Sequence, residues 1–114
     1  MAGPSVCPTQ AARVLDIGCG TGFITAELRR ALPQAAILAT DVFAEGIRLT
    51  GARIQGDAFL FHMDAREMPF SGSLDLITSF DVLEHIKDDD TVLRGMHGAL
   101  APGGIAIKFV RRAL

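Results

Sequence analysis

Five short apolar segments recur along the chain, separated by stretches with the composition of helices or turns. Hydrophobic residues run almost continuously through each segment instead of alternating with polar ones. This pattern is typical of parallel strands that helices cover on both faces. The segments are residues 13–17, 36–40, 58–62, 74–79 and 105–110. The sequence therefore predicts an α/β fold with an open, doubly wound, mostly parallel sheet of about five strands.

Two of the intervening stretches have the periodicity of an amphipathic helix. The first apolar stripe stops at Pro33 and consists of Ile24, Leu28, Ala31 and Leu32. The second follows the acidic residues 88–90, stops at the Pro-Gly-Gly of residues 102–104 and consists of Val92, Met96, Ala99 and Leu100. Residues 44–52 predict a weaker helix, because Gly46 and Gly51 each cost about 1 kcal/mol relative to alanine. Residues 66–73 are predicted to form a loop.

Length and composition limit the domain organisation. A chain of 114 residues is long enough for one domain, and its 49% content of hydrophobic residues is ample for a buried core. Residues 1–12 contain prolines and small polar residues without periodicity, so they are predicted to be a tail or linker. The folded domain is expected to span residues 13–114.

Charge and cysteine content argue against several classes of partner and compartment. The formal net charge is −2, and the chain has no Trp or Tyr, which disfavours a nucleic-acid partner. Cys7 and Cys19 make a poor disulfide framework, which favours a reducing cytoplasm. The first residues lack the pattern of a signal peptide, and no long run of apolar residues predicts a membrane span.

The first strand leads into a glycine loop that opens a helix, in the sequence VLDIGCGTG of residues 14–22. Glycines at 18, 20 and 22 allow a ligand to approach the backbone, and free N–H groups at the helix start favour a negatively charged group. A dinucleotide fingerprint would require a third glycine where Phe23 stands, which disfavours NAD. Asp16, just before the loop, would repel a pyrophosphate but is able to accept hydrogen bonds from an ammonium group.

Acidic residues also follow other strands. Asp41 ends the second strand near the spacing of about 20 residues at which a carboxylate reaches ribose hydroxyls. Asp64 and Ala65 follow the third strand, where a carboxylate is placed to accept the exocyclic amine of adenine. The sequence SFDVLEH of residues 79–85 follows the fourth strand. Because the carboxyl ends of parallel strands meet at one edge, these residues are expected to converge on one crevice.

These motifs together resemble the class I S-adenosylmethionine-dependent methyltransferases, of the small-molecule type called type 11 or type 12. The resemblance covers residues 14–109 and includes ILATDVF, HMDAREMPFSGSLDLI and LRGMHGALAPGGIAI besides the two motifs above. It implies a Rossmann-like fold, S-adenosylmethionine as cofactor and methyl transfer to a small-molecule acceptor; the charge and composition above argue against a nucleic-acid or membrane partner. The residues that it implies in cofactor binding are Asp16, Gly18, Cys19, Gly20 and Gly22 for the methionine and ribose portions, Asp41 for the ribose, Val42, Asp64 and Ala65 for the adenine, and Phe80 and Asp81 for the methionine side.

Methyl transfer from a sulfonium requires mainly positioning of the reactants. A general base is needed only for some acceptors, and His85 is the side chain predicted to fill that role. Glu84 and His85 alone are weak evidence for a metal site, so none is predicted. Simpler structural roles compete with these assignments: Asp41 as a helix cap, Asp64 as a turn residue and His85 as an ordinary hydrogen-bonded histidine.

The sequence departs from the family pattern at both ends. The family has a helix before the glycine loop, and a helix and two further strands after the fifth strand, one of them antiparallel. This chain is therefore expected to be truncated after the fifth strand, with an exposed strand edge available for self-association. An alternative function is that of a non-catalytic cofactor-binding or interaction fragment that needs a partner or missing segments; a nicotinamide-dependent oxidoreductase is a third.

Overall fold

The computed structural model describes residues 12–80 and 89–109. In this part of the chain, strands and helices alternate as predicted, except that β3 is followed directly by β4, through the loop predicted for residues 66–73. The strands are β1 (Arg13–Ile17), β2 (Ala36–Asp41), β3 (Phe59–His62), β4 (Leu74–Phe80) and β5 (Leu100–Phe109). The helices are α1 (Phe23–Ala31), α2 (Ala44–Arg53) and α3 (Asp89–Ala99).

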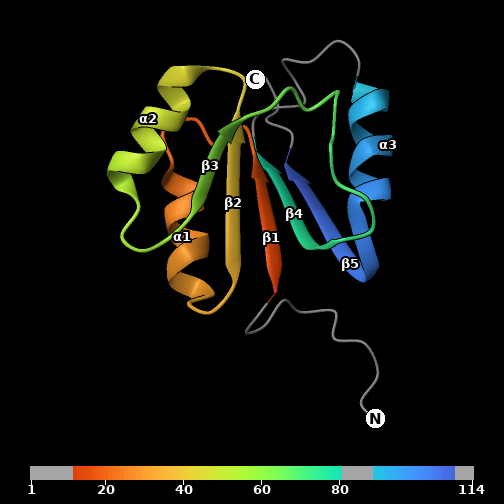
Figure 1. Ribbon diagram of the computed structural model, residues 1–114, viewed down its shortest axis with the longest axis horizontal. Coiled ribbons are helices and arrows are strands. Elements are labelled where there is room, and N and C mark those ends of the chain that lie inside the picture. Colours follow the sequence, from red (N-terminus) through yellow and green to blue (C-terminus); the bar gives the residue numbers. More distant parts are fainter. Residues whose placement is uncertain (1–11, 81–88, 110–114) are drawn as a thin grey trace.

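The five strands form one sheet in the order β3-β2-β1-β4-β5, and every neighbouring pair is parallel. All five strands therefore point their carboxyl ends to the same edge of the sheet (Figure 1). From β1, the strand order continues to β2 and β3 on one side of the sheet and to β4 and β5 on the other side. Ligands of open α/β sheets bind at the point where the strand order reverses in this way. The glycine loop follows β1 at this place.

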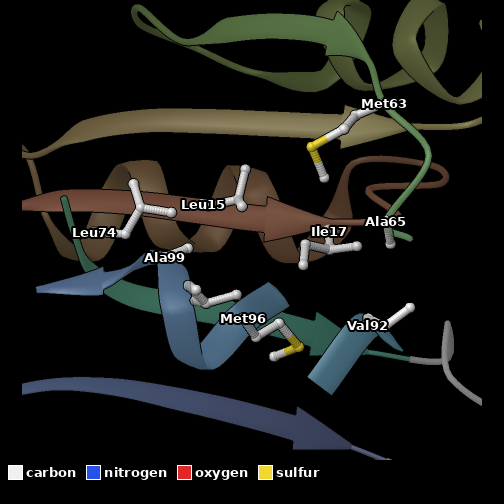
Figure 2. Close-up of a cluster of buried hydrophobic side chains, with 9 residues drawn as sticks. Leu15, Ile17, Met63, Ala65, Leu74, Val92, Met96 and Ala99 are labelled. Carbon is white, nitrogen blue, oxygen red and sulfur yellow. The ribbon is translucent and has the colours of Figure 1, made fainter. Parts of the chain in front are cut away.

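Separate clusters of buried side chains cover the two faces of the sheet. On one face, Val14 and Ile37 pack with Leu28 of α1. On the other face, Leu15 and Ile17 pack with Met96 of α3 (Figure 2). Figure 1 accordingly shows α1 and α2 on one side of the sheet and α3 on the other. Neighbouring residues Val14 and Leu15 of β1 thus pack into the clusters on opposite faces of the sheet, which explains why both are apolar.

The predicted α/β fold is confirmed, and the differences lie at element ends. The weak helix is present and runs to Arg53. Its two glycines allow α2 to lie close to Asp41 and Leu60. The prediction for the fifth strand was wrong at its start: β5 already begins at Leu100, which had been assigned to the preceding helix. Its register against β4 shifts between Leu74 and Leu76, so the Pro-Gly-Gly sequence forms an irregular part of the strand.

No helix within residues 12–80 and 89–109 has the length and apolar character needed to cross a membrane.

Candidate functional site

The glycine loop between β1 and α1 is a left-handed turn without large side chains. Gly18, Gly20 and Gly22 have φ angles of 69°, 57° and 86°. A Cβ built on Gly20 would meet only the Gly18 carbonyl oxygen, at 3.9 Å, so this part of the loop faces open space. The backbone can therefore be approached closely by a ligand, as the sequence predicted.

Not all the loop N–H groups are free for a ligand. The Cys19 N–H donates to the carbonyl oxygen of Thr40 at 2.8 Å, and the Gly22 N–H donates to that of Cys19 at 2.8 Å. The Gly20 N–H donates to Oδ2 of Asp41, also at 2.8 Å. These three hydrogen bonds fix the shape of the loop, whereas the free donors expected at the start of α1 stay a prediction.

Asp41 links the carboxyl ends of β1 and β2. Besides the Gly20 N–H at Oδ2, its Oδ1 accepts the N–H of Phe43 at 2.9 Å. The residue is 7% exposed, and both bonds come from backbone donors. The carboxylate therefore joins the glycine loop to the turn before α2. The simpler prediction of a helix cap was wrong, because the N-cap of α2 is Phe43 and no side-chain hydrogen bond caps this helix. Since a carboxylate offers about four acceptor positions, it retains capacity for ligand hydroxyls.

Asp16 has a different environment from the one expected. Its Oδ2 accepts the hydroxyl of Thr25 on α1 at 2.5 Å, and its Oδ1 accepts that of Thr78 on β4 at 2.9 Å. Thr78 lies opposite Asp16 in the β1–β4 register, and the Asp16 residue is only 2% exposed. The described contacts make Asp16 a buried link between helix and sheet, whereas its contact with an ammonium group stays a prediction.

Burial raises the pKa of Asp16 above its ordinary value, although the two threonine hydroxyls oppose the shift. The folded chain then holds this proton more tightly than the unfolded chain, so stability is lost as the pH rises above about 4. We expect Asp16→Asn to remove this loss, since asparagine is neutral and still has an acceptor and a donor for the two hydroxyls. Urea unfolding across a pH series measures the effect; parallel profiles for the two proteins would contradict it.

Asp64 and Ala65 follow β3 and occupy different surroundings. The Asp64 carboxylate accepts the backbone N–H of Arg66 at 2.9 Å and its guanidinium at 2.6 Å. These bonds lower the pKa of Asp64 to about 2. Ala65 is buried in the core on the α3 face. Asp64 is thus the turn residue of the simpler prediction, and its half-buried carboxylate lies beyond the carboxyl end of β3.

Replacing Arg66 with alanine is expected to raise the pKa of Asp64 from about 2 towards its ordinary value of 3.8. In the unaltered chain, the pair stabilises folding at neutral pH and this contribution disappears as the pH falls from about 4 towards 2. Because the guanidinium is exposed, the contribution is about 1 kcal/mol or less. Titration of the side-chain carboxyl by carbon NMR gives the pKa directly, and an unchanged value in the variant would be inconsistent with this pairing.

Two further predicted residues lie beside Asp41. Cys19 is buried, with its Sγ 3.8 Å from the Gly46 carbonyl oxygen, and burial raises the pKa of its thiol. Val42 is 56% exposed although it directly follows Asp41 in the chain. An open apolar side chain next to a carboxylate suits a ligand that combines a flat apolar ring with hydroxyl groups.

The predicted residues after β4 fall mostly outside the described part. Phe80 is the last residue of β4. Asp81, Glu84 and His85 lie between the two described ranges, so their predicted roles are untested. Within residues 12–80 and 89–109, no three His, Cys, Asp or Glu side chains gather where they would hold a metal ion.

Sequence reasoning missed three residues of α2 that touch the site. Gly46 lies against Asp41, where a Cβ would stand 2.5 Å from Oδ2. The Thr50 hydroxyl donates to the Gly20 carbonyl oxygen at 3.3 Å, and Nε of Arg53 donates to the Thr21 carbonyl oxygen at 2.9 Å. Thr50 and Arg53 lie 30 and 32 positions beyond their partners, so no local motif connects them. The sequence signal for Gly46 was the presence of two glycines in a helical stretch.

A model of the methyltransferase domain matches residues 14–104 of the chain. The chain belongs to the methyltransferase domain family. Trans-aconitate 2-methyltransferase of Deinococcus radiodurans is 36% identical to it over 94 residues, which make up 82% of this chain and 36% of that protein. Ubiquinone biosynthesis O-methyltransferase of Xanthomonas oryzae pv. oryzae is 32% identical over 100 residues, covering 82% of this chain and 40% of that protein.

The solved structures agree with the family assignment. Phosphoethanolamine N-methyltransferase 2 of Haemonchus contortus, in complex with S-adenosylmethionine, superimposes with a TM-score of 0.80 at 27% identity. The match covers 93% of this chain and 25% of that one. The methyltransferase domain thus spans less than half the length of the relatives described here. The predicted family, the Rossmann-like fold and S-adenosylmethionine as the family's cofactor are confirmed.

The residues at the site fit this cofactor. The glycine loop leaves backbone open at Gly20, the Asp41 carboxylate has acceptor capacity left, and Val42 presents an uncovered apolar side chain. These features match, in order, the amino-acid portion, the ribose hydroxyls and the adenine ring of S-adenosylmethionine. All of them lie at the carboxyl ends of β1 and β2.

Proposed function

We propose that the methyltransferase domain binds S-adenosylmethionine at the carboxyl ends of β1 and β2 and transfers its methyl group to a small molecule. The observation that carries the proposal is the hydrogen bond from the Gly20 N–H to Asp41. This bond ties an open glycine loop to a carboxylate that can accept ribose hydroxyls. The bound cofactor supplies an activated methyl group, and the protein contributes orientation and exclusion of water.

The remaining predicted residues complete the proposed site. Val42 contacts the adenine ring, and Asp64 with the Ala65 backbone accepts and donates at its edge. Asp64 is suited to this because its carboxylate is ionised at neutral pH and accepts hydrogen bonds. Phe80, the last residue of β4, and Asp81, the next residue in the sequence, line the methionine side.

The proposed methyl acceptor is a small molecule. The names of the three relatives above each point to a low-molecular-mass acceptor, and they support the same class here. Where the acceptor is a hydroxyl, thiol or protonated amine, His85 is the proposed general base, since its ordinary pKa lies near working pH.

The buried free thiol of Cys19 suits a reducing compartment, and we place the domain in the cytoplasm.

Calorimetric titration of the 114-residue chain with S-adenosylhomocysteine tests cofactor binding. We expect saturable binding that weakens about tenfold or more in Asp41→Ala, the equivalent of about 1.4 kcal/mol. NADH serves as the matched dinucleotide control and should not bind. Absence of S-adenosylhomocysteine binding by a folded chain, or binding of NADH in its place, would overturn the proposal.

A second assay tests the acceptor class. The chain is incubated with methyl-labelled S-adenosylmethionine and a cell extract that has been separated by size. Label in the low-molecular-mass fraction is the expected result, whereas label confined to protein would show that the acceptor class is wrong.

A second candidate function is a cofactor-binding module that acts through a partner. It is favoured by the position of β5 at the edge of the described sheet, where Ile107 is 45% exposed. Unpaired strand edges are templates for association with another chain. Sedimentation distinguishes the candidates when combined with the transfer assay, because this module would associate and bind cofactor without transferring methyl groups.

A further inference from the structure

The second half of α2, which includes Thr50 and Arg53, contacts the glycine loop. α1 and α2 lie on the same side of the sheet (Figure 1), and the loop that starts α1 meets α2 at several points. The backbone approach is close, since a Cβ on Gly22 would stand 2.6 Å from Cα of Thr50. At Gly22 the loop and the backbone of α2 are therefore in contact without a side chain of the loop between them.

Two side chains of α2 bind consecutive carbonyl oxygens of the loop. The hydroxyl of Thr50, which is fully buried, donates to the Gly20 carbonyl oxygen. The Arg53 guanidinium donates to that of Thr21 and lies 6.0 Å from the ring centroid of Phe23, the first residue of α1. The carbonyl oxygens of Gly20 and Thr21 thus both accept hydrogen bonds from α2.

Holding the carbonyl oxygens determines where the N–H groups of the same peptides point, because a peptide unit is planar. The peptide between Gly20 and Thr21 is fixed by Thr50, and the peptide between Thr21 and Gly22 is fixed by Arg53. The loop glycines would otherwise have access to many backbone conformations, and ordering them on binding would cost affinity. Contacts from α2 reduce that cost before a ligand arrives.

We propose that Thr50 and Arg53 are positioning residues that hold the glycine loop in its cofactor-binding shape by gripping the Gly20 and Thr21 carbonyl oxygens. The proposal deepens the proposed function, on which it rests for the identity of the ligand. It assigns a role to the second half of α2 that no local sequence motif indicates. Neither residue has to touch the cofactor for this effect.

Hydrogen exchange of the unliganded chain tests the shape of the loop separately from binding. The amides of Gly20 and Gly22 are both hydrogen-bonded, so their exchange reports on loop opening. Thr50→Val and Arg53→Met remove the donors with little change of volume. We expect faster exchange at both glycines in each variant, and near-normal exchange in Thr50→Ser, which retains the hydroxyl.

Arg48→Met is the matched control on the same helix. Arg48 donates to Glu45 at 2.8 Å on an exposed surface and has no recorded hydrogen bond to the loop. Arg48→Met therefore removes an arginine from α2 but leaves the hydrogen bonds between α2 and the loop in place. Unchanged glycine exchange in Thr50→Val and Arg53→Met, or the same acceleration in Arg48→Met, would overturn the proposal.

Affinity for S-adenosylhomocysteine is the second readout. Each donor-removing variant is expected to bind about fivefold more weakly, the equilibrium equivalent of one net hydrogen bond. Arg48→Met and Thr50→Ser should bind as the unaltered chain does. If the unaltered chain does not bind S-adenosylhomocysteine, the proposed function fails while the exchange experiment still decides whether α2 holds the loop.

Discussion

Replacing Gly22 with alanine is expected to destabilise the domain by about 3 kcal/mol or more and to abolish cofactor binding. Two costs combine at this position. The φ angle of 86° is unfavourable for alanine, and the new Cβ would stand 2.6 Å from Cα of Thr50. The second cost is the larger, because backbone cannot move aside without shifting α2. Since a domain of this kind has only about 5–15 kcal/mol of stability, the loss is severe.

Gly72 provides a matched control for the conformational cost alone. Its φ angle is 59°, yet a Cβ there would have no neighbour within 4 Å. Gly72→Ala should therefore cost about 1–2 kcal/mol, from backbone strain only, and leave binding intact. Urea unfolding of the two variants, with calorimetric titration of S-adenosylhomocysteine, separates strain from collision. Equal losses of unfolding free energy in both variants would mean that Thr50 does not restrict the loop.

The fold was predictable because its signals are local in sequence. Continuous apolar runs marked the strands, and the turn from β1 into α1 was recognisable from glycine spacing alone. Predictions failed where the decisive neighbour is distant in sequence. Leu100 has the spacing of a helical residue, but pairing with Leu74 of β4 makes it the start of β5.

The same contrast between local signals and distant neighbours holds for the residues of the site. Asp41 was found because a carboxylate at a strand end has a recognised spacing from the glycine loop. The surroundings of Asp16 were not predictable, since its partners Thr25 and Thr78 come from a helix and a strand that only the folded chain brings together. The same holds for Arg53, which looks like an ordinary surface residue of a helix until its bond to Thr21 is known.

Gly46 offers a way to disturb Asp41 without removing it. In sequence, this glycine only weakens a helix, so alanine should stabilise α2 by about 1 kcal/mol. In the folded chain, the added Cβ would stand 2.5 Å from Oδ2 and 2.7 Å from Cγ of Asp41. The carboxylate must then rotate away from the Gly20 N–H that it accepts at 2.8 Å. Because a side chain moves and not the backbone, the fold can absorb the change.

We therefore expect Gly46→Ala to weaken binding of S-adenosylhomocysteine by about tenfold or more, while the free energy of unfolding changes by only about 1 kcal/mol in either direction. Gly51→Ala is the matched control in the same helix, since its Cβ would meet only the end of the Leu60 side chain, at 3.2 Å. It should retain binding. Calorimetric titration and urea unfolding of both variants give the two quantities. Normal binding by Gly46→Ala would show that the position of the Asp41 carboxylate does not govern affinity, whereas a loss shared by both variants would trace the effect to the helix as a whole.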